Sequence, residues 1–263
     1  MPELPDVETF KRYIQSTSLH QPIQRVESLE ARLVKNTSRP ALCRALMDRS
    51  LEEPRRHGKY LFLRTDGDPI LLLHFGMTGR PHYYRDPEQE PDYPVLYLVF
   101  ENGYRLAYSA PRKLGEIRLL KDIGAFIRQK GLGPDPIADD MTEEDFRGRL
   151  EGRRGTVKGA LMDQSCIAGI GNEYSNEILF QMRLHPKADM RALDVGDRED
   201  LYLTTLGVLR TAIDAGAEKV RFPDSYLLKH QFGDGKCPGC GGEIQRMEVL
   251  GRGTYWCPSC QEA

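Results

Sequence analysis

The segment that decides the C-terminal fold is residues 237–260, CPGCGGEIQRMEVLGRGTYWCPSC. It contains two Cys-x2-Cys pairs, Cys237 with Cys240 and Cys257 with Cys260, separated by 16 residues. This spacing is typical of a four-cysteine zinc site, in which the metal replaces the core that so short a module cannot build. The sequence therefore predicts one structural Zn²⁺ bound by these four thiolates.

An alternative for the same four cysteines is a pair of disulfides, which are typical of secreted chains. The start of the chain, MPELPDVETF, lacks the basic-then-apolar order of a secretory signal, so the zinc site is favoured. Cys43 and Cys166 are isolated, and we expect each to be a plain buried thiol. Because closed all-cysteine sites are structural, the metal should position another residue, and Arg252 in the hairpin is the candidate.

Upstream of the zinc segment the chain has helical character. Thr142, followed by three acidic residues, resembles a helix N-cap with its first turn. A Gly- and Pro-rich stretch, GLGPDP at 131–136, precedes it and indicates a domain boundary. We predict helices over residues 142–150, 156–164, 172–182 and 197–215.

Before that boundary, from about Val26 to Leu120, short apolar runs predict a mainly antiparallel β domain. VLYLVF at 95–100 and YRLAY at 104–108 flank an Asn-Gly pair, which is a strong hairpin signal. An amphipathic helix is expected over Pro5–Ser16, because apolar residues recur there at helical spacing.

The first residues also carry chemistry. Removal of Met1 would free the amine of Pro2, and an α-amino group with a pKa of about 8 has an appreciable neutral fraction at pH 7. Attack of this secondary amine on a sugar carbon would leave an iminium that acts as an electron sink. Glu3 lies next to it and is placed to move protons during ring opening. If Met1 is retained, the nitrogen of Pro2 is locked in an amide.

Composition is that of a folded globular chain, with 40% hydrophobic and 29% charged residues. The net charge of −2 gives no general nucleic-acid signal. No apolar run reaches the roughly 18 residues of a membrane span, so we expect a cytoplasmic protein, nucleoid-associated if bacterial. One segment is locally basic, either as a phosphate-binding surface or as a solvated helix face: Arg147, Arg149, Arg153, Arg154 and Lys158.

Five separated motifs closely resemble those of formamidopyrimidine-DNA glycosylase and its endonuclease VIII relatives. They are MPELPDVET at 1–9, GKYL at 58–61, HFGMTG at 74–79, DQS through GIGNEY at 163–174, and GRGT at 251–254. They occur in order along the whole chain, and chance agreement of all five together with the zinc spacing is negligible.

The resemblance implies an α+β multidomain fold. An N-terminal antiparallel β-sandwich with flanking helices would span 1–128, a helical helix-two-turns-helix domain 129–225, and a four-cysteine zinc β-hairpin 226–263, with DNA between the domains. It further implies a monomeric base excision repair enzyme without a small-molecule cofactor. Such an enzyme would excise oxidised bases from damaged double-stranded DNA and cleave the abasic site by β,δ-elimination.

Four residues match catalytic positions of the family. Pro2 resembles the Schiff-base nucleophile, and Glu3 resembles the acid that assists sugar opening. Lys59 resembles the lysine that contacts phosphate and donates a proton in β-elimination. Arg252 resembles the zinc-hairpin arginine that grips the phosphate and is associated with δ-elimination.

Five further residues match DNA-binding positions. Asn172 and Lys158 resemble phosphate contacts. Because a base inside a duplex hides its C1′ atom, such an enzyme must flip the nucleotide out and fill the gap. Met77 and Arg112 match the gap-filling positions, and Leu114 stands where the family has an aromatic wedge.

The chain departs from the family pattern at positions that bear on lesion choice or gap filling more than on cleavage. APRKLG at 110–115 replaces the usual Asp-Pro-Arg-[Arg/Lys]-Phe-Gly, Asp6 replaces a glutamate, and Tyr93-Pro94-Val95 lacks a histidine found in many 8-oxoguanine enzymes. Residues 216–236 are shorter than the region that caps 8-oxoguanine. We therefore expect no strict 8-oxoguanine preference.

Three other functions fit parts of the sequence. A non-catalytic binder of damaged or structured DNA would keep the fold and the phosphate contacts. An abasic-site lyase would retain the Pro2 chemistry without strong base excision. A zinc-dependent RNA-binding module would use only the cysteine segment. The set formed by Pro2, Glu3 and Lys59 argues for the enzyme.

Overall fold

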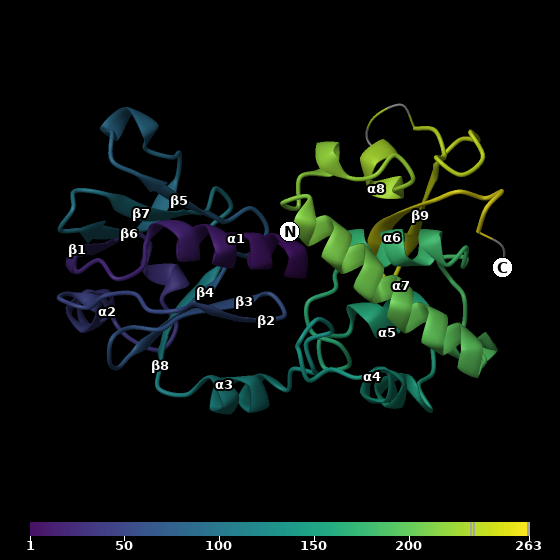
Figure 1. The fold of residues 1–263 in the computed structure, drawn as a ribbon, viewed down its shortest axis with the longest axis horizontal. Coiled ribbons are helices and arrows are strands. Elements are labelled where there is room, and N and C mark those ends of the chain that lie inside the picture. Colours follow the sequence, from purple (N-terminus) through teal and green to yellow (C-terminus); the bar gives the residue numbers. More distant parts are fainter. Residues whose placement is uncertain (232, 234, 262–263) are drawn as a thin grey trace. The chain divides into compact units, whose positions relative to one another are not determined.

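The computed structural model describes residues 1–231, 233 and 235–261 (Figure 1). The chain divides into two compact units. Unit 1 comprises Met1–Pro2 and Asp6–Lys130, and unit 2 comprises Glu3–Pro5 and Gly131–Ala263. The three-part division at residues 128 and 225 stays a prediction.

Unit 1 contains two antiparallel four-stranded sheets. One has the order β1-β6-β7-β5, with β1 Ile23–Ser28, β6 Pro94–Phe100, β7 Arg105–Ser109 and β5 Arg80–Tyr84. The other has the order β2-β3-β4-β8, with β2 Arg55–His57, β3 Tyr60–Leu63, β4 Ile70–His74 and β8 Glu116–Leu120.

The two sheets share one core, as a β-sandwich requires. Alternate residues point inward, because side chains along a strand alternate between faces. Leu61 and Leu63 of β3 lie in the same buried cluster as Leu96 and Leu98 of β6. The predicted hairpin of β6 and β7 is confirmed, with Phe100 and Tyr104 paired across the Asn-Gly turn.

Three helices accompany these sheets: α1 Leu4–Thr17, α2 Arg39–Leu46 and α3 Ile123–Lys130. The amphipathic helix predicted over 5–16 is confirmed by α1, which buries Val7 and Ile14 in the sandwich core. Neither α2 nor α3, each eight residues long, was predicted. Ser38 caps α2 by accepting the N–H of Ala41, a local signal that the sequence analysis missed.

Unit 2 consists mainly of helices and ends in a hairpin. The helices are α4 Glu143–Leu150, α5 Val157–Met162, α6 Asn172–Gln181, α7 Val195–Asp214 and α8 Leu227–His230. The hairpin pairs β9 Gln245–Val249 with β10 Arg252–Trp256. Short 3-10 turns lie at Met190–Ala192 and Lys219–Arg221 in unit 2, and at Ala31–Leu33 and Pro87–Gln89 in unit 1.

The four predicted helices are confirmed within two residues at each end by α4 to α7. Thr142 accepts from the Asp145 backbone and Asp145 returns the bond, which completes the expected capping box. The long α7 packs against α4 and α6 (Figure 1). Apolar residues of α4 to α7, with Leu4, form the core of unit 2.

In the described part of the chain, no helix has the length and apolar character needed to cross a membrane.

Candidate active site and metal centre

The four predicted metal ligands converge. The sulfurs of Cys237, Cys240, Cys257 and Cys260 all lie within 4.8 Å of one another. Two of the separations are 3.7 Å, between Cys237 and Cys260, and 3.5 Å, between Cys240 and Cys257. A tetrahedron with Zn–S bonds of about 2.3 Å has edges of about 3.8 Å. The cluster therefore fits one structural zinc, and the cysteines are free thiols rather than disulfides.

Backbone N–H groups around the cysteines donate to two of the sulfurs and would stabilise thiolates. Gly239 donates its backbone N–H to Cys237 Sγ and Gly242 donates to Cys240 Sγ, each at 3.4 Å. Cys257 donates its N–H to Gln261 Oε1 at 2.9 Å, and Gln261 Nε2 donates to the carbonyl of Leu184 at 2.8 Å. Gln261 thus ties the second knuckle to the segment that follows α6. The sequence analysis did not identify this residue.

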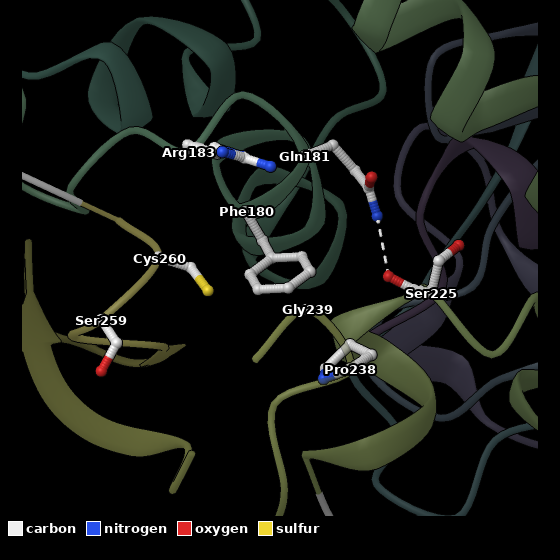
Figure 2. A pocket seen from close by; sticks show the side chains of 8 residues that line it. All are labelled: Phe180, Gln181, Arg183, Ser225, Pro238, Gly239, Ser259 and Cys260. Carbon is white, nitrogen blue, oxygen red and sulfur yellow. Dashed lines mark hydrogen bonds between the residues drawn. The ribbon is translucent and has the colours of Figure 1, made fainter. Parts of the chain in front are cut away.

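The zinc module rests on the C-terminal half of α6. The Phe180 ring is buried in one cluster with Cys237, Cys257 and Leu227. Beside it lies a hollow of about 550 Å³, and Figure 2 shows Phe180 pointing into it between Cys260 and Gly239. None of the predicted catalytic residues lines this hollow.

Arg252 begins β10, directly after the hairpin turn, as the sequence suggested. It pairs with Val249 and its side chain is exposed. The hairpin is joined to the start of α6, because Asn172 Nδ2 donates to the carbonyl of Gly253 at 2.9 Å. One amide N–H of Asn172 is therefore occupied within the protein, and its predicted contact with phosphate stays a prediction.

Glu3 is bound at the N-terminus of α6. The N-cap residue of this helix, Gly171, has no side chain to accept the first backbone N–H groups. The Glu3 carboxylate takes this role from a distant part of the sequence. Its Oε2 accepts from Gly171 at 2.7 Å and from Tyr174 at 3.3 Å, and its Oε1 accepts from Glu173 at 3.0 Å. The positive end of the helix dipole further stabilises the negative charge.

The backbone of the same segment is also fixed. Leu4 donates its N–H to the carbonyl of Gly169 at 3.0 Å, and the Leu4 side chain is buried in the core of unit 2. Glu3 is only 2% exposed. Next to it, Pro2 is half-buried and Met1 is exposed. The contacts of Glu3 and Leu4 therefore fix the residue that directly follows Pro2 in the sequence.

Lys158 differs from the expectation for a phosphate contact. It lies on α5 with 0% exposure, and its Nζ donates to Asn176 Oδ1 on α6. Burial lowers the pKa of Lys158 to about 7, with Glu3 opposing this shift and Arg252 adding to it. A contact between phosphate and a side chain so deeply buried would require a rearrangement.

Unit 2 therefore brings together four of the predicted residues. Glu3 and Asn172 meet at the start of α6, and the charges of Glu3 and Arg252 both act on Lys158. In the basic segment, Arg147 pairs with Glu143 at 3.3 Å and Arg153 with Asp163 at 2.7 Å. Arg149 and Arg154 are exposed, so a phosphate-binding role of the segment stays a prediction.

Lys59 lies in unit 1, in the turn between β2 and β3, and is 6% exposed. His74 lies nearby, and its ring packs on Tyr60 at 4.9 Å. Burial lowers the pKa of His74 to about 4, with Glu116 opposing this shift and Lys59 contributing to it. His74 is thus neutral at physiological pH. The HFGMTG motif contains it, but the sequence analysis assigned it no role.

The three predicted gap-filling residues share one exposed edge of unit 1. Met77 is 40% exposed, Leu114 is 54% exposed, and Arg112 is exposed between them in sequence. Their loops touch at Gly76, where an added Cβ would lie 2.5 Å from the Leu114 carbonyl. Gly76 also has φ +60°, so only glycine fits this contact without strain.

The remaining cysteines differ from each other. Cys166 is fully buried, and burial raises its pKa, as expected for an inert thiol. Cys43 is only half-buried, at the edge of the sandwich core.

Comparison with known proteins places these features in one family. The model of the formamidopyrimidine-DNA glycosylase N-terminal domain matches residues 1–117, and that of its H2TH domain matches 132–224. A zinc finger found in FPG and IleRS matches 235–263.

Relatives match over their full length. The formamidopyrimidine-DNA glycosylase of Heliobacterium modesticaldum is 36% identical over 278 residues, with 100% of both chains covered. That of Herpetosiphon aurantiacus is 31% identical, covering 99% of this chain and 100% of its own.

Solved structures agree. The Lactococcus lactis enzyme bound non-covalently to DNA with an AP site has a TM-score of 0.88 at 29% identity, covering 99% of this chain and 100% of its own. MutM in complex with carbocyclic 8-oxo-G containing DNA has a TM-score of 0.88 at 30% identity, with 100% of both chains covered. The chain belongs to the formamidopyrimidine-DNA glycosylase family.

Proposed function

We propose that this protein is a base excision repair DNA glycosylase that also cleaves the abasic site, with the amine of Pro2 as nucleophile. The observation that carries this is the fixed carboxylate of Glu3 beside Pro2. Its three backbone donors fix both oxygens, so the residue that follows the nucleophile has one orientation. The proposal requires that Met1 be removed.

The chemistry follows from these positions. The neutral amine attacks the sugar C1′, the base leaves, and the iminium that forms accepts the electrons of the elimination steps. Glu3 moves protons as the sugar ring opens. Lys59 serves as proton donor in β-elimination and as a phosphate contact. Arg252 binds the phosphate and assists δ-elimination.

Binding of the damaged strand uses the remaining predicted residues. Met77, Arg112 and Leu114 fill the space left by the flipped nucleotide, which their exposure on one edge supports. Asn172 and Lys158 contribute near the phosphate, Lys158 only after a rearrangement. The zinc holds the Arg252 hairpin and takes no part in the chemistry.

The substrate class is damaged double-stranded DNA. Solved relatives hold DNA containing Fapy-dG, carbocyclic 8-oxo-G or an abasic site. Because residues 216–236 are shorter than the region that caps 8-oxoguanine in the family, we expect formamidopyrimidine and abasic DNA to be processed at least as well as 8-oxoguanine DNA. We further propose a monomer that acts without a small-molecule cofactor.

Borohydride reduction tests the nucleophile. The protein, shown by intact mass to lack Met1, should be trapped covalently on abasic DNA, and peptide mapping should place the adduct on Pro2. The matched control carries one serine inserted between Met1 and Pro2, which leaves the Pro2 nitrogen in an amide. Equal trapping at an unchanged position in the control would remove Pro2 from the mechanism. Lesion-dependent binding without any scission would favour the non-catalytic DNA binder.

A further inference from the structure

Lys158 is a fully buried cation. It has 0% exposure, and its neighbours on α5, Val157 and Leu161, are buried apolar residues. Transferring an ammonium group out of water is costly unless a counter-charge and hydrogen bonds compensate. The residues that surround its Nζ therefore decide whether the charge persists.

The hydrogen-bond partner of Lys158 is a neutral amide. Asn176, 2% exposed on α6, accepts from Nζ through Oδ1. An amide oxygen can accept from a neutral amine as well as from an ammonium, and it favours the ammonium much less than a carboxylate would. Asn176 thus holds the side chain without fixing its charge.

Most charged residues on the elements packed around Lys158 already have partners of their own. On α6, Glu173 pairs with Lys219 at 2.6 Å, and Glu177 is engaged by the backbone of α8. After α5, Asp163 pairs with Arg153 at 2.7 Å. The charges that act on Lys158 are Glu3, from the N-terminal segment, and Arg252, from the hairpin, which oppose each other.

We propose that Asn176 is a positioning residue whose neutral amide holds the Lys158 amine in either protonation state, so that the charge beside Glu3 is switchable rather than fixed by an ion pair. Protonated Lys158 adds a positive charge near the carboxylate that works at the sugar, and neutral Lys158 removes it. The positive charge of protonated Lys158 favours steps that need anionic Glu3. Loss of that charge favours steps that need protonated Glu3. The inference rests on the proposed role of Glu3.

The lowered pKa of Lys158, about 7, agrees with this reading of the geometry. An aspartate at position 176 would supply the missing counter-charge. An adjacent opposite charge shifts such a group by about 1 to 3 pH units. Asn176→Asp should therefore keep Lys158 charged to higher pH.

The test uses the full zinc-loaded protein with ε-¹³C-lysine, and Lys158→Gln assigns the resonance. In the unsubstituted protein the Lys158 signal should titrate near pH 7, and in Asn176→Asp at least about one pH unit higher. The pH profile of single-turnover scission of abasic DNA should move by the same amount. Asn102→Asp, which adds the same charge in the β6–β7 turn of unit 1, should change neither.

Two results would overturn the proposal. A Lys158 signal that stays charged above pH 9 in the unsubstituted protein removes the switch, and this measurement needs no variant to fold. A midpoint that moves in Asn176→Asp while the scission profile stays in place removes its role in the reaction. Absence of scission in the unsubstituted protein would instead contradict the proposed function, and the titration would still test the pairing of Lys158 with Asn176.

Discussion

The Glu3 carboxylate accepts the backbone N–H of Gly171 at 2.7 Å, across 168 residues of sequence. An acid beside the proposed nucleophile therefore also replaces the missing side-chain cap of α6. In the proposed mechanism, catalysis and helix capping depend on the same two oxygens, so substitutions at Glu3 should affect both.

Glu3→Gln should lower single-turnover base excision by about 10² to 10⁴-fold, because the amide cannot exchange the proton that the sugar step requires. The loss of charge at the helix N-terminus should cost about 1 kcal/mol of unfolding free energy. Burst kinetics on formamidopyrimidine DNA and urea denaturation measure the two effects. Activity within threefold of the unsubstituted protein would rule out Glu3 as the proton carrier.

Removal of zinc should abolish tight binding to abasic DNA, because Arg252 lies on a hairpin that is held by the four thiolates. Chelator-treated protein should lose one metal per chain and its fluorescence-anisotropy signal with labelled abasic DNA. Re-addition of Zn²⁺ should restore both. Full affinity in metal-free protein would show that the hairpin folds unaided.

Gly76→Ala should weaken recognition of a flipped nucleotide, because the new Cβ would collide with the Leu114 carbonyl at a position with φ +60°. We expect at least a tenfold loss in affinity for abasic DNA over intact duplex. Gly148→Ala on α4 is the matched control. Its Cβ meets nothing within 4 Å, so it should be neutral or stabilise by up to about 1 kcal/mol. Equal effects of the two substitutions would contradict a specific role for the Gly76 contact.

Glu177 should make unfolding depend on pH. It is fully buried and accepts from the N–H of Leu227 at 3.2 Å and of Leu228 at 2.8 Å, and burial raises its pKa from 4.5 to about 7. Because the pKa of Glu177 is higher in the folded protein than in the unfolded chain, its protonation stabilises the folded state. This stabilisation is complete below pH 4.5 and is lost as the pH rises through 7.

The difference in unfolding free energy between Glu177→Gln and the unsubstituted protein should therefore change between pH 5 and 8 by at most about 3 kcal/mol. Urea titrations of both proteins at four pH values give the difference, which removes contributions shared by the two. A difference independent of pH would mean that Glu177 titrates as in the unfolded chain.

Spacing in the sequence was enough to predict the local features. The two cysteine pairs identified the metal ligands, and the Asn-Gly turn and the Thr142 cap located a hairpin and a helix. The turn and the cap lie within a few residues of the structure they specify, and the cysteine pairs follow a spacing that is typical of zinc sites. Helix α8 has only four residues and no side-chain N-cap, so it carries no comparable signal. Helix α3 does carry one, because Asp122 accepts the N–H of Ala125, and the sequence analysis missed it.

Contacts between distant residues could not be predicted. The sequence identifies Glu3, but nothing near it indicates that its partners are Gly171 and Tyr174. Likewise, lysine is rarely buried, so the sequence gives no reason to place Lys158 inside unit 2. Its contact with Asn176 depends on how α5 packs against α6. Gln261 contacts a carbonyl 77 residues away and was missed for the same reason.

Residues from opposite ends of the sequence contact the two ends of helix α6. Glu3 binds its first turn, and Gln261 binds the segment just beyond its last turn. A ten-residue helix is a stiff rod of about 15 Å, which shifts as a whole rather than bending. The first residues of the chain and the second zinc knuckle are therefore both anchored to this one short helix of unit 2.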